Sequence, residues 1–210
     1  MDPLISSSPS NQEYLVRWGV AERALSGQDV SGDGHLVCTR PGGGILFAVV
    51  DGLGHGGEAA AATTVALATL NTHVSEPIVR LLNYSHDALK RTRGAAISLA
   101  SFDARHHSLT WLGVGNVEGV VLRDTFRVQQ SIMLFPGVVG YQLPKLWAAE
   151  TLLEPQDLLI LFTDGISRDF LSEPNIGGSP EFIANKICNK YSKPTDDALV
   201  LVARFANAGT

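Results

Sequence analysis

Two acidic residues follow apolar runs that have the length and composition of buried strands. Asp51 follows Ile45–Val50, and glycine fills four of the next six positions. Asp164 follows Leu158–Thr163 and is also followed by glycine. A strand that ends in an acid holds that acid on a rigid scaffold, and glycines beside it let a backbone approach a ligand closely. The two positions predict sites for a hard cation or a phosphate, although a tight Asp-Gly turn is the simpler alternative.

Further acids stand at the beginnings of apolar runs. Asp33 lies in Gly32-Asp33-Gly34, directly before the strand-like segment 35–39, and Asp196-Asp197 precede the apolar run 198–203. Gly-Asp-Gly is also an ordinary turn, so Asp33 taken alone is weaker evidence than Asp51.

If these carboxylates meet at one edge of the fold, they repel one another and cannot all stay ionised without cations. Mg²⁺ or Mn²⁺ prefers oxygen ligands, and a pair of such ions can activate water and stabilise a phosphoryl transition state. The alternative is that the acids lie at different ends of different strands and never meet.

The segments between the acids alternate strand and helix character. Strands are expected at 14–21, 35–39, 45–50, 95–102, 109–115, 117–122, 158–163 and 198–203, with loops and one short strand over 127–147. Helices are expected at 58–74, after a cap at Ser75, briefly from Ser167, and from Ser179. The strands over 95–122 are expected to form an antiparallel meander. Glycines within it, at 113, 115 and 119, indicate bulges, close backbone approach or simple packing under a neighbour.

Length and composition limit the organisation of the chain. Its 210 residues, 45% of them hydrophobic, suit one domain over residues 14–206 after a tail at 1–13. A net charge of −5 without basic runs gives no footprint for nucleic acid or anionic lipid. Cys38 and Cys188 have neither disulfide-framework nor zinc spacing and are expected in the core. No signal peptide or membrane span is recognisable, so a cytoplasmic protein is expected, and we expect it to be a monomer.

Three ordered motifs together resemble a known enzyme family. They are Asp51–Gly56 with the Ala-rich segment behind it, Phe162–Ile166, and Asp196–Val202. They look like the metal-bearing motifs of PP2C-type (PPM) serine/threonine phosphatases, in the variant of the bacterial SpoIIE-like branch. The length is most similar to that of the stand-alone RsbX-type phosphatases.

The resemblance implies an α+β fold, a sandwich of two antiparallel sheets flanked by helices, with two divalent cations, Mn²⁺ or Mg²⁺, at one end. It implies hydrolysis of phosphoserine or phosphothreonine by metal-activated water. By position, Asp51 would bridge the ions, the Gly52 carbonyl would bind one, and Asp164 and Asp196 would complete the ligand set of the second ion. The implied catalytic residues are therefore Asp51, Asp164 and Asp196, with Asp33 and Asp197 as weaker ligand candidates. The implied partner is a phosphorylated STAS-domain protein of a stressosome.

Some features depart from the family pattern. The animal-type enzymes have an early phosphate-binding arginine, whereas Arg17 and Arg23 lack its surrounding motif. Phosphate capture would then depend on the metals. A catalytically inactive module that docks to a phosphorylated STAS-domain partner is the alternative function. The histidines carry no clear chemistry: His55 in the glycine loop is expected to pack there or contact substrate, and His106 and His107 are expected in a turn. Trp18, Trp111 and Trp147 are expected in the core.

Overall fold

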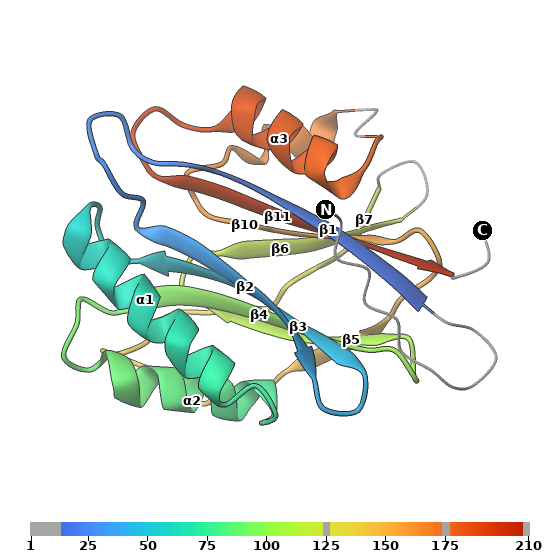
Figure 1. Ribbon diagram of the computed structural model, residues 1–210, viewed down its shortest axis with the longest axis horizontal. Helices are drawn as coiled ribbons and strands as arrows, with labels where there is room; N and C mark the ends of the chain where they lie inside the picture. The colour runs from blue at the N-terminus through green and yellow to red at the C-terminus, as the bar shows by residue number, and fades with distance from the viewer. Residues whose placement is uncertain (1–13, 124–126, 174–176, 208–210) are drawn as a thin grey trace.

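The protein is a four-layer sandwich of helix, sheet, sheet and helix (Figure 1). The computed structural model describes residues 14–123, 127–173 and 177–207, so the predicted tail at 1–13 lies outside the described residues. One sheet, here the β1 sheet, has the order β1-β11-β10-β6-β7. The other, the β3 sheet, has the order β2-β3-β4-β5-β8, and β9 also pairs with β5. The predicted fold class is confirmed, with one parallel pair, β5 and β8, among antiparallel ones.

The strands and helices follow the chain in the predicted alternation. The β1 sheet contains β1 (Tyr14–Arg23), β6 (Glu118–Arg123), β7 (Arg127–Ser131), β10 (Leu158–Phe162) and β11 (Ala198–Asn207). The β3 sheet contains β2 (Asp33–Arg40), β3 (Gly44–Gly52), β4 (Ala95–Asp103), β5 (Ser108–Val114), β8 (Leu134–Phe135) and β9 (Ala149–Leu152). The helices are α1 (Gly57–Thr72), α2 (Ile78–Leu89), the 3₁₀ helix η1 (Arg168–Ser172) and α3 (Pro180–Tyr191).

The central strands are apolar on both faces because each sheet is covered on both sides. One face of β3 packs into the core between the sheets, with Phe47 and Val49 fully buried there. Its other face packs under α1 and α2, with Leu46 and Val50 buried. At about 25 cal/mol per Å² of apolar surface, this two-sided burial gives the central strands the largest share of the hydrophobic stabilisation. It fixes where each strand ends.

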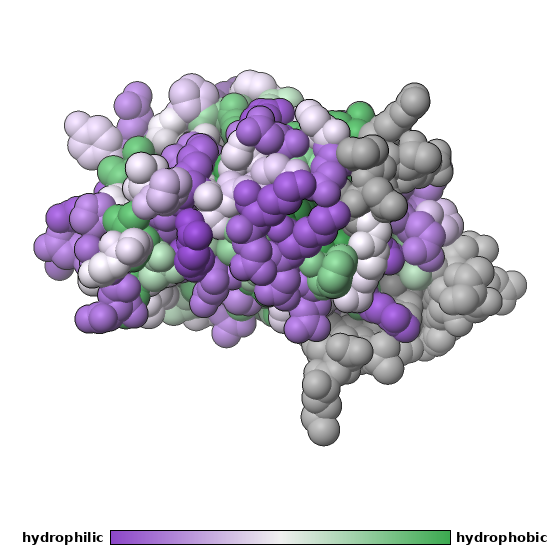
Figure 2. Space-filling model, turned by 90° about the horizontal axis from the view of Figure 1, so that it is seen from above, coloured by the Kyte–Doolittle hydropathy of each residue, from purple (hydrophilic) through white to green (hydrophobic). Residues whose placement is uncertain are grey.

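The helices form the outer layers. Small alanines let α1 lie close to the β3 sheet, since Ala59, Ala62 and Ala66 are fully buried. The β1 sheet is covered by α3, which begins at the cap Ser179 and runs across β1 and β11. Viewed from the α3 side, the surface is mainly hydrophilic, with small separate hydrophobic patches (Figure 2). Among the described residues, no helix combines the length and apolar character needed to span a membrane.

The second helix does not begin as predicted. Ser75 is not its cap; α2 starts at Ile78 after Pro77, and no side chain caps it. The reason is Arg40 of β2, whose guanidinium donates to the carbonyls of Val74 and Glu76 at 3.0 and 2.6 Å. These bonds hold the linker between α1 and α2 against the sheet, so its residues are unavailable for a helical turn.

The predicted meander over residues 95–122 is also wrong in one respect. The strands β4 and β5 pair as expected, but β6 pairs with β10 in the other sheet. The chain crosses between the sheets at Gly115, whose φ of 94° favours glycine. The glycines here are packing positions: a Cβ on Gly113 would lie 2.3 Å from Ser98 Oγ, and one on Gly119 would lie 2.6 Å from a Leu161 methyl.

The side chains expected in the core differ in burial. Trp111 and Cys188 are buried, Trp18 and Cys38 are half-buried, and both cysteines are free. Trp147 is 55% exposed, so its predicted core position is wrong. It packs edge-on against Phe135, with ring centroids 4.5 Å apart, because β8 and the following loop lie at the edge of the β3 sheet.

Candidate active site

Two of the predicted aspartates face each other across neighbouring strands. Asp33, the first residue of β2, is directly opposite Asp51 near the end of β3. Paired residues of antiparallel strands lie on the same face, with Cβ atoms roughly 5 Å apart. Asp33 is only 8% exposed, whereas Asp51 is half-buried. The hairpin 33–51 therefore brings two carboxylates together at one end of the β3 sheet.

The other three aspartates come from the β1 sheet. Because β10 and β11 are antiparallel neighbours, the end of β10 and the start of β11 lie at the same edge. Asp164 follows β10, and Asp196 and Asp197 precede β11. Gly165 is required by this crossing, since a Cβ there would lie 1.8 Å from the Asp197 carbonyl oxygen. The backbones themselves thus hold the two acidic loops together.

Thr163 joins the two sheets at this edge. Its hydroxyl donates to Asp33 Oδ2 at 2.8 Å and accepts from the Leu199 amide at 2.9 Å. Thr163, directly after β10, therefore hydrogen-bonds with both an acid of the β3 sheet and the backbone of β11. Sequence reasoning did not single out Thr163, although its position directly before Asp164 was a usable signal.

Asn116, in the crossover between the sheets, is a second residue that the sequence did not reveal. Its amide donates to Asp164 Oδ2 at 2.7 Å and also hydrogen-bonds with Asp51. One amide group in contact with both carboxylates places Asp51 and Asp164 close together. No motif marks an asparagine in a turn as functional, so only the fold shows this contact.

Asp197 has a different environment from its neighbour Asp196. Its carboxylate is 3% exposed and accepts from the backbone amides of Leu25 and Gly32, at 2.7 and 2.8 Å. Both oxygens are thus used to anchor the loop between β1 and β2. Asp196 is half-buried, and one of its oxygens accepts from the Asp197 amide at 2.9 Å. The other is available for a ligand.

Burial and mutual repulsion disfavour the ionised acids. Desolvation and then the charge of Asp51 raise the pKa of Asp33 to about 8. Desolvation and the charges of Asp164, Asp196 and Asp197 raise the pKa of Asp51 to about 7. The pKa of Asp196 is raised for the same reasons, and nearby His55 opposes this. The five aspartates are therefore one electrostatic group.

The glycine loop after β3 is held by the chain around it. A Cβ on Gly52 would lie 2.2 Å from the Ala59 carbonyl oxygen, so α1 can begin this close to β3 only because residue 52 is glycine. The Leu53 amide donates to the Gly94 carbonyl at 3.0 Å, and Arg93 forms an ion pair with Glu58. His55 is exposed at the surface of this loop. The glycines thus serve close packing of the protein on itself, beyond any role toward a ligand.

Basic side chains contact the backbone of the acidic loops, not their carboxylates. Lys193 Nζ donates to the Asp164 carbonyl at 2.5 Å, and Arg23 Nη2 donates to the Lys193 carbonyl at 2.9 Å. Within the described residues, no salt bridge includes any of the five aspartates. Arg17 lies farther along β1, opposite Arg204, and so away from this edge.

The donor set suits hard divalent cations. Carboxylate oxygens without cationic partners are the ligands that Mg²⁺ and Mn²⁺ prefer. Over the described ranges 14–123, 127–173 and 177–207, however, no three acidic, histidine or cysteine side chains stand in a geometry that would already hold an ion. The aspartates are within electrostatic range of one another, and binding an ion between them requires side-chain rotation.

Comparison with known proteins gives this arrangement a family. The family model for stage II sporulation protein E (SpoIIE) matches residues 41–206, which include Asp51, Asp164 and both acids before β11. The chain belongs to the SpoIIE family. Its fold and family are those of PP2C-type phosphatases, as the sequence motifs indicated.

Relatives of this SpoIIE-family chain agree with the assignment. The phosphoserine phosphatase RsbX of Bacillus subtilis (strain 168) is 25% identical over 166 residues, covering 77% of this chain and 81% of RsbX. A solved structure from work on the bacterial stressosome, a modular system adapted to control secondary messenger signaling, is 31% identical. Its TM-score is 0.82, and the matched region covers 90% of this chain and 99% of the chain in that structure. A crystal structure of RsbX with magnesium has a TM-score of 0.79 at 21% identity, covering 98% of this chain and 100% of its own.

Proposed function

We propose that the protein is a metal-dependent serine/threonine protein phosphatase that acts on a phosphorylated signalling protein. The observation that carries this proposal is the group of aspartates from both sheets, in which burial and neighbouring carboxylates raise the pKa of Asp33, Asp51 and Asp196, and in which no acid has a salt bridge among the described residues. A fold has no structural use for such repulsion, whereas bound cations would offset it.

Asp51, Asp164 and Asp196 are the proposed ligands of two divalent cations, Mn²⁺ or Mg²⁺, with the Gly52 carbonyl as a further ligand. Bound ions of this kind generate a nucleophilic water near neutral pH and stabilise negative charge on a phosphoryl group. In this assignment Asp51 and Asn116 have different roles. Asp51 extends from β3, whose residues 45–50 are all buried, and Asn116 orients it together with Asp164.

Asp33 and Asp197 have supporting places in the proposal. Thr163 holds Asp33 behind Asp51, where its charge can reach an ion without direct contact. Asp197 uses both oxygens for backbone amides, which supports Asp196 as the ligand of the pair. Its role is to keep the loop between β1 and β2 against the acidic edge, the end of the two sheets that carries Asp33, Asp51, Asp164, Asp196 and Asp197.

The proposed substrate is a phosphorylated STAS-domain protein of a stressosome, met in the cytoplasm. The resemblance to the phosphoserine phosphatase RsbX and to the stressosome structure supports this choice. The negative net charge of −5 supports a protein partner over nucleic acid.

The test is release of phosphate from a phosphoserine STAS-domain protein, with Mn²⁺ or Mg²⁺ added and with chelator. Turnover that requires the metal is the expected result. Tight binding of the phosphoprotein with no turnover at any metal concentration would refute the enzyme and leave the inactive docking module. An aryl phosphate measured in parallel separates a failed reaction from a wrong choice of protein substrate.

A further inference from the structure

Two arginines lie side by side on the outer face of the β1 sheet, far from the acidic edge. Arg204 of β11 is directly opposite Arg17 of β1. Arg204 is also opposite Leu158 of β10, which in turn is opposite Leu122 of β6. Paired residues share a face, so Leu122, Leu158, Arg204 and Arg17 form one row across four strands.

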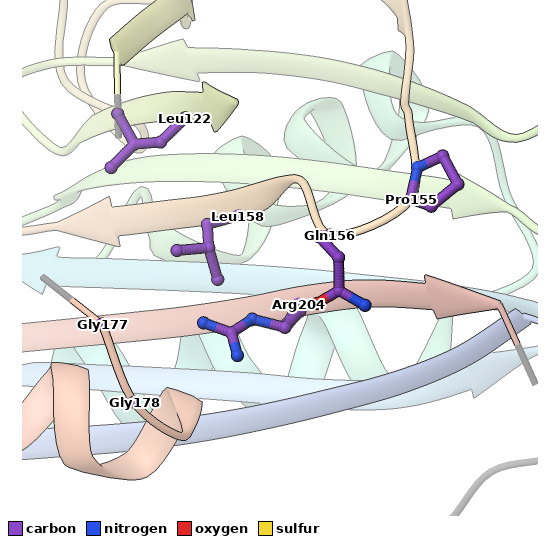
Figure 3. A pocket seen from close by; sticks show the side chains of 7 residues that line it. All are labelled: Leu122, Pro155, Gln156, Leu158, Gly177, Gly178 and Arg204. Carbon is purple, nitrogen blue, oxygen red and sulfur yellow. The ribbon is translucent and has the colours of Figure 1, made fainter. Parts of the chain in front are cut away.

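This row lies where α3 stops covering the sheet. Leu122 and Leu158 belong to the core under α3, and Gly19, two residues after Arg17, touches the α3 backbone at Glu181. Beside the start of α3 a pocket of about 310 Å³ opens over the row. It is lined by Leu122, Leu158 and Arg204 and by the backbone of Gly177 and Gly178, with the turn Pro155-Gln156 above (Figure 3).

The guanidinium of Arg204 has unmet hydrogen-bonding capacity. Its Nε is buried and has no hydrogen-bond partner among the described residues, and the side chain is half-buried in the pocket wall. Within the described part of the chain, neither Arg204 nor Arg17 has a salt bridge to an acid. The pKa of Arg204 is lowered by burial and then by the like charge of Arg17. An unpaired buried donor is costly, and two adjacent cations repel each other. An anion in the pocket would remove both costs.

The shape of the pocket indicates what carries the anion. Its floor is apolar at Leu122 and Leu158, and its polar groups are on one side, at Arg204 and Gln156. The Arg204 guanidinium fork, with the positive charge of Arg17 beside it on the neighbouring strand, suits a dianionic phosphate better than a single carboxylate. The leucines suit an organic body beside it.

We propose that this pocket, here the Arg204 pocket, binds the phosphate group of a small phosphorylated organic molecule. It is a second anion site, separate from the acidic edge: six residues of β11 lie between Asp197 and Arg204. A ligand there would contact β11, the strand that follows the Asp196-Asp197 loop. It would also contact Gly177 and Gly178, just before α3, the helix that precedes this loop.

The test uses metal-free protein, because without cations the aspartates repel anions and binding at that edge does not obscure binding at the Arg204 pocket. The probe is phenylphosphonate, whose carbon–phosphorus bond a phosphatase does not hydrolyse, titrated by calorimetry against the full chain. We expect binding that weakens about tenfold or more in Arg204→Gln. Arg80→Gln, which removes an exposed arginine of α2 instead, should bind like the parent.

Further arms identify the ligand class. Inorganic phosphate should bind several-fold more weakly than phenylphosphonate because it cannot use the leucine floor, and benzoate should bind more weakly because it carries one charge. Benzoate binding more tightly would overturn the phosphate assignment, and equal affinity for inorganic phosphate would overturn the role of the floor. Undiminished phenylphosphonate binding by Arg204→Gln, or none by the parent, would overturn the site. Arg204→Leu, expected to be at least as heat-stable as the parent, guards against loss of binding through unfolding.

Discussion

The two ends of β10 carry acids in opposite circumstances. Asp157, before the strand, is 1% exposed and receives Arg123 as a fork, with Nε to Oδ1 at 2.9 Å and Nη2 to Oδ2 at 2.8 Å. The Glu154 amide also donates to it, at 2.8 Å. Asp164, after the strand, is half-buried near Asp51 and Asp196, and among the described residues its carboxylate accepts a side-chain hydrogen bond from the Asn116 amide.

The contrast separates an acid that stabilises the fold from an acid to which we assign chemistry. A buried carboxylate that exists to stabilise the protein is given an arginine and backbone amides. Carboxylates that raise one another's pKa destabilise the metal-free fold, and the chain keeps them at one edge anyway. Asp157 has its partners within the protein, whereas we propose that cations supply the partners of the aspartates at the other end.

The largest expected effect is that of Asp51→Asn, which keeps the shape but removes the charge at the centre of the group. We expect metal-dependent hydrolysis to fall about 10³-fold or more, since several kcal/mol of transition-state stabilisation depends on the ions. Steady-state phosphate release and calorimetry with Mn²⁺ measure it. Asp103→Asn, an acid-to-amide change at an exposed turn, is the matched control. Mn²⁺ binding as tight as in the parent would disprove the assignment of Asp51 as the bridging ligand.

The opposite end is tested by Asp157→Asn, which leaves Arg123 facing a neutral amide. Removing one partner of a buried ion pair costs about 3–5 kcal/mol, or roughly 6–20 °C in Tm for a domain of this size. Hydrolysis per folded molecule should stay at the parent level below that Tm. Thermal unfolding and activity are measured on the same samples. A loss of turnover without a loss of Tm would contradict the division between a structural and a chemical end.

The pH dependence of metal-free stability follows from the acidic edge. The pKa values of Asp33 and Asp51, about 8 and about 7 in the fold, exceed the value of 3.8 expected for an unfolded chain. At pH values between 3.8 and these folded-state pKa values, the native state holds protons that the unfolded state has released. Stability should therefore fall as pH rises from about 4 through about 8, by several °C in Tm from pH 5 to pH 8.

Saturating Mn²⁺ should remove or reverse this trend, because the ions bind the ionised carboxylates and compete with protons. Melting curves at pH 5, 6, 7 and 8, with chelator and with Mn²⁺, give the comparison. In Asp51→Asn the slope with chelator should be shallower. A metal-free protein that gains stability up to pH 8 would show that the aspartates are not a mutually repelling group.

Most of the fold could be predicted from the sequence because buried strands are recognisable as apolar runs, and acids and glycines mark where these runs end. The runs before Asp51 and Asp164 and after Asp197 are strands at the expected places. What the runs do not encode is which sheet a strand joins. That depends on pairing across the chain, so the passage of β6 to the β1 sheet was missed.

The acidic edge was predictable only in part for a related reason. Aspartates at strand ends are rare enough to notice, whereas Thr163 and Asn116 are ordinary polar residues whose partners lie far away in sequence. The distinction between Asp196 and Asp197 likewise depends on the amides of Leu25 and Gly32, which only the fold brings near. Residues that hold a site together carry less sequence signal than those that line it.

The smallest expected effect concerns the turn that presents Asp157. Gln156 has a φ of 74°, a left-handed conformation that suits glycine, between Pro155 and the paired acid. Holding a non-glycine residue there costs on the order of 1 kcal/mol, so Gln156→Gly should raise Tm by roughly 2–4 °C. Gln130→Gly, in β7 with no such backbone strain, should lower it, because glycine weakens a strand. Melting curves of both variants with the parent decide the point. A lower Tm for Gln156→Gly would mean that the glutamine side chain stabilises this end by more than its backbone costs, and that the turn, like the ion pair it carries, is built for the fold alone.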